Sequence, residues 1–435
     1  MRIPAARLAG LFMALLFALS APAAEFRAEN FPDSNWRTWA PREEISPKFD
    51  VVPSGGRRGA SALRIQMKNE SEHGGWVTEV RSIAPGEMHK FSAWYAASNI
   101  QHDARSVIAK IEWLNEKGEL VRAPDFAISG QGDGQWRQVS LTTPAPKQAV
   151  AARLQLAIGF AKDATVVWDD ISFGLARDVS KRVVRAGTIF LRPRGTKSAG
   201  ESVEKFCKLA EAESNARLDI LCLPEGITVI GNGKSYAAVS ESVPGPTTER
   251  LGKLARQLRS YVVAGLYERE GAVIYNTAVL LGRDGKLVGK YRKTHLPREE
   301  WEAGLSPGNE YPVFETDFGK IGLMICWDVQ FPEPARAMAL KGAEALFLPI
   351  WGGSEVLARA RAIENHVFLV SSSYDMKTFI VAPDGKVLAE ASSEQPLATA
   401  ELRLDEHIFQ PWLGDMKNRT WKERRPDIAV ETRSR

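Results

Sequence analysis

Cysteine is scarce in this chain, which has only three cysteines among its 435 residues: Cys207, Cys222 and Cys326. So few cysteines exclude a small domain held together by a disulfide framework. A bridge between Cys207 and Cys222 is one way to pair two of them, but the sequence does not decide it. Because the count is odd, at least one thiol stays free.

A strong charge of either sign is also lacking. The chain has 57 basic and 53 acidic side chains, and the formal charge of +4 offers no case for a nucleic-acid partner. The histidines of the first half, His73, His89 and His102, do not have the spacing of metal ligands, and no ligand cluster occurs elsewhere. We therefore expect no metal and no cofactor.

Residues 1–24 have the pattern of a secretory signal peptide. Arg2 and Arg7 give a positive start, Leu8–Leu19 is an apolar core, and Ala21–Ala24 offers small residues for cleavage. The core is shorter than the ~20 apolar residues that a membrane-spanning helix needs. We therefore expect a secreted or periplasmic protein; an uncleaved N-terminal anchor is the alternative.

Residues 25–176 alternate apolar and polar side chains in short runs, such as Leu63–Met67, Ile108–Trp113 and Arg153–Ile158. A period of two is typical of half-buried strands. Turn signals such as Gly132-Asp133-Gly134 separate the runs. Several short strands at this spacing predict an antiparallel β-sandwich.

This predicted sandwich is rich in tryptophan. It holds seven of the twelve in the chain: Trp36, Trp39, Trp76, Trp94, Trp113, Trp136 and Trp168. We expect most of them in the core, because tryptophan is highly buried on average, whereas an exposed ring offers a flat face on which a sugar can stack. Gly134–Val139 and Val166–Phe173 resemble segments of jelly-roll, galactose-binding-like domains. That resemblance implies a jelly-roll fold and a polysaccharide or cell-envelope glycan as partner.

After a short polar linker, residues 177–182, the pattern changes to alternating strands and helices. Residues 183–405 contain two helical patterns, Glu201–Ala212 and Thr247–Leu258, between apolar runs such as Leu218–Leu223. This alternation favours an α/β domain. Residues 406–435 form a C-terminal tail.

The stretch Gly322–Glu333 organises the second domain. Ile321–Ile325 is an apolar run typical of a buried strand, and Pro332 opens a helical pattern, so Cys326 falls on a strand-to-helix turn. Helix N–H groups at such a turn can stabilise a thiolate, the nucleophilic form of cysteine. Cys326 is therefore a candidate nucleophile; the alternative is a buried structural cysteine.

Two further residues follow strand patterns, where α/β folds tend to place their sites. Glu225 follows Leu218–Pro224, and Lys293 follows Leu287–Arg292. A cysteine nucleophile needs a base, and a shielded carboxylate suits that role. A fixed ammonium such as Lys293 can stabilise the oxyanion of an acyl-transfer reaction. Taken singly, each is more often a solvated surface residue than a catalytic one.

Two histidines compete with Glu225 for the role of base. His295 lies next to the Lys293 motif, and His366 lies in the helical pattern beyond Cys326. Cysteine–histidine pairs are the commoner arrangement among thiol hydrolases. The residues alone leave this choice open.

The joint pattern resembles the nitrilase superfamily of carbon–nitrogen hydrolases. The resemblance extends from about residue 183 to about residue 402. Its motifs occur in order: Leu223-Pro224-Glu225, Asn276-Thr277-Ala278, Tyr291–Leu296, Ser306-Pro307-Gly308, Gly322–Glu333, Lys341–Glu344, Arg361–Asn365 and Pro383-Asp384-Gly385.

The resemblance implies a Glu225–Lys293–Cys326 triad in an α-β-β-α sandwich, and it gives His295 a supporting position. A second glutamate near Pro307-Gly308 is also implied, and Glu302 is favoured over Glu300. The N–H of Trp327 would share in binding the oxyanion. The family usually pairs into a homodimer or larger homo-oligomer, a contact that the tail motif Lys422–Pro426 tends to support.

The implied activity is hydrolysis of a small amide or N-carbamoyl amine through a thioester on Cys326. Asp328 stands where true nitrilases usually have glutamate, which disfavours nitriles as substrates. An acyltransferase that uses the same thioester is one alternative. A glycan-binding protein with a non-catalytic hydrolase-like scaffold is the other.

Overall fold

The computed structural model describes residues 26–27, 35–81, 83–177, 179, 181–410, 412–425 and 428. The predicted signal peptide, residues 1–24, lies outside them. The chain divides into two compact units, residues 1–177 with 425–435, and residues 178–424. Within the described residues, no helix combines the length and apolar character that crossing a membrane requires.

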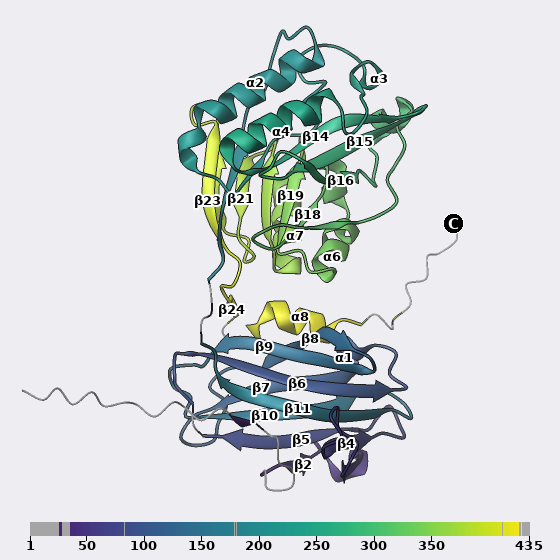
Figure 1. The fold of residues 1–435 in the computed structure, drawn as a ribbon, viewed down its shortest axis with the longest axis vertical. Helices are drawn as coiled ribbons and strands as arrows, with labels where there is room; N and C mark the ends of the chain where they lie inside the picture. The colour runs from purple at the N-terminus through teal and green to yellow at the C-terminus, as the bar shows by residue number, and fades with distance from the viewer. Residues whose placement is uncertain are drawn as a thin grey trace, which may run out of the picture. The chain divides into compact units, whose positions relative to one another are not determined.

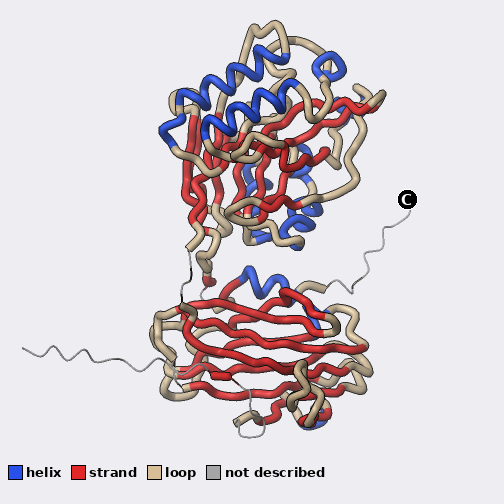
Figure 2. The backbone as a smooth tube through the Cα atoms, in the orientation of Figure 1, coloured by secondary structure: helices blue, strands red, loops and turns tan. Residues whose placement is uncertain are grey.

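The first unit consists almost entirely of strands (Figure 2). All of their pairings are antiparallel, in the order β2-β5-β10-β7-β8-β9-β6-β11-β4-β3, with β1 beside β11. The strands are β1 (Phe26–Arg27), β2 (Arg37–Trp39), β3 (Lys48–Val52), β4 (Ala62–Gln66), β5 (His73–Val80), β6 (Met88–Ser98), β7 (Val107–Leu114), β8 (Asp125–Asp133), β9 (Trp136–Pro144), β10 (Ala151–Gly159) and β11 (Thr165–Leu175). The helical turns are η1 (Glu43–Ile45) and α1 (Asp103–Ser106).

One apolar core lies between the two halves of this sheet. Trp113 of β7 and Phe173 of β11 belong to strands that do not pair, yet their rings lie 6.1 Å apart across the core. Four of the seven tryptophans are buried, namely Trp76, Trp113, Trp136 and Trp168. The predicted antiparallel strands are therefore present, whereas the jelly-roll and galactose-binding-like likeness stays a prediction.

The second unit contains two six-stranded sheets, with helices α2 and α4 on one side and α6 and α7 on the other (Figure 1). The sheet orders are β16-β15-β14-β13-β12-β23 and β17-β18-β19-β20-β21-β22. A core cluster with residues from both sheets fills the space between them, and another lies between the first sheet and its helices. This is the α-β-β-α sandwich that the resemblance implied.

The first half of this unit contains β12 (Val183–Ile189), α2 (Ala199–Ala212), η2 (Ser214–Ala216), β13 (Ile220–Cys222), α3 (Tyr236–Val239), α4 (Pro246–Leu258), β14 (Tyr261–Glu270), β15 (Val273–Leu281), β16 (Leu287–Arg292) and α5 (Arg298–Glu302). The second half contains β17 (Val313–Glu315), β18 (Lys320–Leu323), η3 (Cys326–Gln330), α6 (Pro332–Leu340), β19 (Ala345–Pro349), α7 (Glu355–Asn365), β20 (Phe368–Ser372), β21 (Thr378–Val381), β22 (Val387–Ala391), β23 (Leu397–Arg403), β24 (Phe409–Gln410), β25 (Gly414–Asp415) and α8 (Met416–Glu423).

Local chemistry explains the helix boundaries. The Ser198 side chain accepts a hydrogen bond from Glu201 N at 3.2 Å and so caps α2, and Pro246 occupies the first turn of α4. Both helices lie within two residues of their predicted bounds. Cys207 and Cys222 are buried free thiols, so the bridge between them does not form.

Candidate active site

Cys326 is the first residue of η3, and its backbone has φ of +44°, a left-handed value that is uncommon for a residue with a side chain. Strain of this kind is typical of functional turns. The Sγ atom lies 3.8 Å from the carbonyl oxygen of Gly352, beyond the end of β19. The strand-to-helix turn predicted for Cys326 is therefore present.

The resting state of the sulfur differs from our expectation. Burial, assisted by the adjacent Glu225 carboxylate and opposed by the charge of Lys293, raises the pKa of the Cys326 thiol to about 12. The helix N–H groups therefore do not produce a resting thiolate. A proton acceptor must act when the sulfur attacks.

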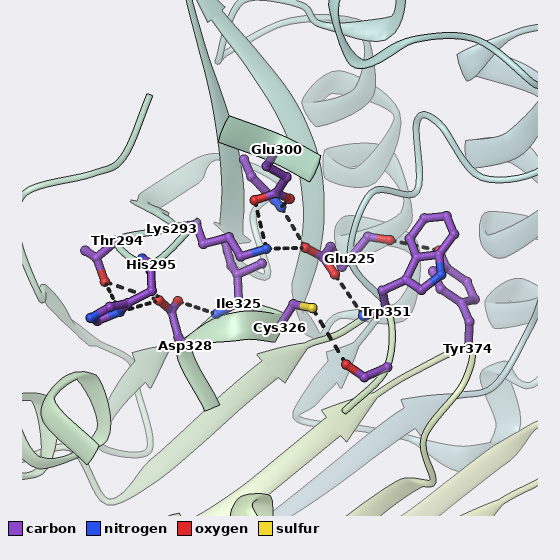
Figure 3. A network of polar contacts seen from close by, with 12 residues as sticks. Glu225, Lys293, Thr294, His295, Glu300, Ile325, Cys326, Asp328, Trp351 and Tyr374 are labelled. Carbon is purple, nitrogen blue, oxygen red and sulfur yellow. Dashed lines mark hydrogen bonds and ion pairs between the residues drawn. The ribbon is translucent and has the colours of Figure 1, made fainter. Parts of the chain in front are cut away.

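Glu225 lies in the loop after β13 and is 2% exposed. Its Oε1 accepts hydrogen bonds from Asn276 Nδ2 at 2.6 Å and from Lys293 Nζ at 3.0 Å (Figure 3). Its Oε2 accepts one from Trp351 N at 2.8 Å, and its backbone oxygen accepts one from the Tyr374 hydroxyl at 2.9 Å. Three donors thus hold the carboxylate beside the nucleophile, and a fourth holds the backbone of Glu225.

Lys293 follows β16 and is 1% exposed. Its Nζ lies 3.0 Å from Glu225 Oε1 and 2.9 Å from Glu300 Oε2. Burial alone would lower the pKa of the ammonium, but Glu225 and Glu300, joined by the Cys326 sulfur when it is ionised, more than offset this effect and raise that pKa. Lys293 therefore keeps its positive charge throughout the ordinary pH range.

The preference for Glu302 over Glu300 is corrected by the structure. Glu300 is 3% exposed and contacts Lys293, whereas Glu302 is exposed and pairs with Arg298 at 2.6 Å. The two positions lie about 200° apart around helix α5, so only one of them can face the site. Burial, opposed by Lys293 and assisted by the Glu225 charge, raises the pKa of Glu300 to about 7.

The rival bases lie away from the sulfur. His295 stacks on Phe331 at 4.0 Å, and its Nδ1 lies 3.0 Å from Asp328 Oδ1. His366 ends helix α7, where its Nε2 lies 3.2 Å from the Thr420 hydroxyl. Neither contacts Cys326, so the geometry favours Glu225 as the proton acceptor.

Asp328, a fully buried carboxylate two residues after Cys326, has a structural role that its motif did not predict. It joins the turn of the nucleophile to the loop that carries Lys293. Its oxygens accept hydrogen bonds from Ile325 N (2.9 Å), His295 N (3.1 Å), the Thr294 hydroxyl (3.2 Å) and the Tyr291 hydroxyl (2.8 Å). The position of Asp328 in a motif does not indicate that it joins these two loops; its hydrogen bonds do.

Trp327 occupies the first turn of η3, where N–H groups have no partner within the helix. That position suits its predicted share in binding an oxyanion, and its ring is 41% exposed. Among the described residues, no three His, Cys, Asp or Glu side chains gather in a way that would hold a metal ion.

A sequence profile of the carbon-nitrogen hydrolase family matches residues 194–408, all within the second unit. The omega-amidase NIT2 of Xenopus tropicalis is 32% identical over 234 residues, which are 47% of this chain and 84% of that protein. The human omega-amidase NIT2 is 30% identical over 230 residues, 47% of this chain and 83% of that protein. This chain belongs to the carbon-nitrogen hydrolase family.

Solved structures of this hydrolase family are also similar to the chain. Nit3 of Saccharomyces cerevisiae has 25% identity and a TM-score of 0.46, and covers 52% of this chain and 92% of its own. An amidase from Nesterenkonia has 24% identity and a TM-score of 0.45, and covers 52% of this chain and 92% of its own. By its family membership the protein is an enzyme that hydrolyses carbon–nitrogen bonds, and its relatives include amidases.

Proposed function

We propose that this hydrolase is an exported amidase that cleaves a linear amide or N-carbamoyl amine through a thioester on Cys326. One observation carries the proposal: Glu225 and Lys293, which are 68 residues apart, form a buried ion pair at 3.0 Å beside the sulfur. A base, a fixed cation and a nucleophile in one place are the parts that acyl transfer needs.

The reaction begins when the Cys326 sulfur attacks the amide carbonyl carbon while Glu225 takes the thiol proton. The carbon–oxygen π electrons move onto the oxygen, and Lys293 with the Trp327 N–H stabilises that oxyanion. The oxyanion then collapses, the carbon–nitrogen bond breaks, and Glu225 gives its proton to the departing nitrogen. An acyl thioester and free ammonia or amine result.

Water completes the cycle. Glu225 takes a proton from the water as its oxygen attacks the thioester carbon, and the same oxyanion site is used again. The carbon–sulfur bond breaks, the carboxylic acid leaves, and the proton returns to the sulfur. No atom beyond substrate, water and these side chains is consumed.

The substrate class is supported by the relatives. Several are named omega-amidases, and none of the reaction steps above requires a peptide substrate. The Asp328 carboxylate accepts a hydrogen bond within the turn that holds Cys326, so it is not available as a catalytic group. A linear amide is therefore the substrate to test first.

The experiment is an amide panel scored by ammonia release, with Cys326→Ala and Cys326→Ser beside the wild type. Both variants should lose turnover by about 10³-fold or more. Cys207→Ala, a change at a buried thiol in α2, is the matched control and should keep the turnover of the wild type. Near-normal hydrolysis by Cys326→Ala would overturn the proposal, and amine adducts formed in competition with water would indicate an acyltransferase.

Export is part of the proposal and is supported by the signal-peptide pattern of residues 1–24. Mass spectrometry of the protein from its native cell should find a mature chain that begins near residue 25. An intact Met1 with a cytoplasmic location would contradict it.

We also propose that the first unit binds a polysaccharide. Trp39 is 37% exposed and Phe160 is 50% exposed, and the ring of His73 lies 5.8 Å from each of them. Phe160 has φ of +58°, and the Arg105 guanidinium lies 4.8 Å from its ring centroid. Solvent-facing rings held by a strained turn suit stacking on sugars.

Affinity electrophoresis of the full chain in gels containing different polysaccharides tests this surface. Trp39→Ala and Phe160→Ala should abolish any retardation, while Trp412→Ala, a change at a ring that is 78% exposed, should not. Equal mobility of wild type and both variants in every gel would refute glycan binding at this site.

A homo-oligomer is the last part of the proposal. Val356 is 73% exposed and Ile363 is 44% exposed on helix α7, an apolar surface that a second copy would cover. Light scattering should give a mass of two chains or more, and Val356→Glu should reduce it. A monomeric wild type would contradict this part.

A further inference from the structure

Asn276 connects the two buried glutamates of the site. It lies in β15, is fully buried, and its Nδ2 is 2.6 Å from Glu225 Oε1 and 2.6 Å from Glu300 Oε1. One amide nitrogen has two hydrogens, so it can donate one to each carboxylate. The same residue's backbone oxygen accepts a hydrogen bond from Lys293 N at 2.8 Å.

These contacts close a ring of four side chains. Lys293 Nζ contacts Glu225 and Glu300 from one side, at 3.0 and 2.9 Å, and Asn276 contacts both from the other. Two donors therefore alternate with two acceptors. The Oδ1 of Asn276 has no hydrogen-bond partner among the described residues, so the donating end alone holds this side chain in the ring.

The charge of the ring explains why an amide suits position 276. Two carboxylates this close repel each other when both are ionised, and one ammonium neutralises only one of them. A second cation would bind both carboxylates tightly in the ionised form, and a third carboxylate would add to the repulsion. A neutral donor stabilises ionised Glu225 and still leaves Glu300 able to hold a proton.

We propose that Asn276 is a positioning residue for the reaction: its amide holds Glu225 and Glu300 against Lys293 and so places the Glu225 carboxylate where it accepts the Cys326 proton. This inference rests on the proposed function and deepens it. Other titratable groups around the ring are Cys326 of η3 and three tyrosines. The tyrosines are Tyr236 of α3, Tyr267 of β14 and Tyr374 after β20, and burial raises the pKa of each above its ordinary value. They stay neutral, so the carboxyl group of Glu300, whose pKa is raised to about 7, sets the pH response near neutrality.

The test compares Asn276→Ala and Asn276→Asp with the wild type by the pH dependence of kcat/KM. Loss of a donor disfavours the ionised carboxylates, so the acidic limb should move up by about one pH unit in Asn276→Ala, and further in Asn276→Asp. Activity at pH 7 should fall about 10- to 100-fold. Thr277→Val is the matched control, because Thr277 is the next residue of β15, is equally buried and donates to Glu268 at 2.9 Å away from the ring.

A merely structural role makes a different prediction. Asn276→Ala would then lower thermal stability as Thr277→Val does, with the acidic limb in its wild-type position, and that result overturns the inference. If Asn276→Ala does not fold, the position of the acidic limb of kcat/KM in the isosteric Asn276→Asp variant distinguishes the two roles.

Carboxyl ¹³C titration of the glutamates gives a readout that needs no turnover. The Glu300 resonance, assigned with Glu300→Gln, should titrate at higher pH in Asn276→Ala than in the wild type. Unshifted titration curves overturn the positioning role. A wild type that turns over no amide but shows the shift would leave this inference standing and refute the proposed function alone.

Discussion

Gly265 has no side chain, and the backbone of Glu225 occupies the space that a side chain at position 265 would fill. A Cβ atom at position 265 would lie 2.6 Å from Glu225 Cα and 3.1 Å from Gly226 N. Gly265 N donates to Pro224 O at 3.0 Å, and Ile227 N donates to Gly265 O at 2.9 Å. The loop that carries the proposed base therefore lies directly on β14, at a distance that only a glycine permits.

Gly265→Ala should displace Glu225 and lower kcat by about 10-fold or more, because small misplacements of a catalytic group have large kinetic effects. Overpacking should also reduce the free energy of unfolding by about 1–3 kcal/mol. Gly200→Ala in α2, where the nearest atom is 3.9 Å away, is the control and should leave kcat unchanged. Kinetics and urea unfolding measure both effects; an active Gly265→Ala would contradict the close packing described.

Lys293→Met should lower kcat by about 10²–10³-fold, because it removes a charged donor from the oxyanion site. It also leaves Glu225 and Glu300 buried without their cation, which should cost about 3 kcal/mol of folding stability. Lys286→Met, at a side chain that is 85% exposed, should change neither quantity. Steady-state kinetics and chemical unfolding provide the comparison, and equal behaviour of the two variants would argue against the role of Lys293.

Glu300→Gln and Glu302→Gln separate the two candidates for the second glutamate. Glu300 contacts Lys293 and Asn276, so its substitution should lower kcat/KM by about 10-fold or more. Glu302 is exposed and pairs with Arg298 on the surface of α5, so its substitution should leave kcat/KM within about twofold. Kinetics on the best amide of the panel decide between them; the reverse ranking would restore Glu302.

The pKa of Glu300 predicts a pH dependence of stability. Its folded-state pKa of about 7 lies above its ordinary value of 4.5, so between these pH values the folded chain holds a proton that the unfolded chain has released. Stability therefore falls as pH rises through this window, by on the order of 3 kcal/mol relative to Glu300→Gln. Urea unfolding from pH 4.5 to 8 measures the difference, and parallel curves for the two proteins would exclude it.

Asp328→Asn should weaken both the fold and the activity. The substitution replaces one carboxylate oxygen with an NH2 group, whose hydrogens then face either Ile325 N or His295 N, each of which is itself a donor. Leaving such groups unsatisfied should cost about 2–3 kcal/mol, and kcat should fall because Cys326 and Lys293 lose their common anchor. Asp284→Asn, in a surface turn, is the control. Unchanged unfolding and kinetics in Asp328→Asn would show that the anchor is dispensable.

Much of the fold followed from local patterns. Apolar spacing placed α2 and α4 within two residues, and the alternation in residues 25–176 indicated the antiparallel strands of the first unit. The two sheets pack against each other where β12 meets β20. There Thr188 donates a hydrogen bond to Ser371 O at 2.7 Å, although the two residues are 183 positions apart in the chain. Periodicity carries no information on such contacts; only the family resemblance implied them.

The residues of the site also fall into two groups: those that motif order predicts, and those whose role depends on contacts across the fold. Motif order singled out Glu225, Lys293 and Cys326, which the structure brings together. Glu300 and Glu302 share one short acidic segment, and only the direction of α5 distinguishes them. Asn276 stood in a motif without a role, because its importance lies in two contacts made across the fold.

The protonated resting sulfur of Cys326 has a further consequence. Peroxides and disulfides react with a thiolate far faster than with a thiol, so a nucleophile whose pKa is raised to about 12 is a poor target for them between turnovers. Substrate and base generate the reactive form only for the duration of the attack. The resting sulfur should therefore form a sulfenic acid more slowly than an exposed thiolate does.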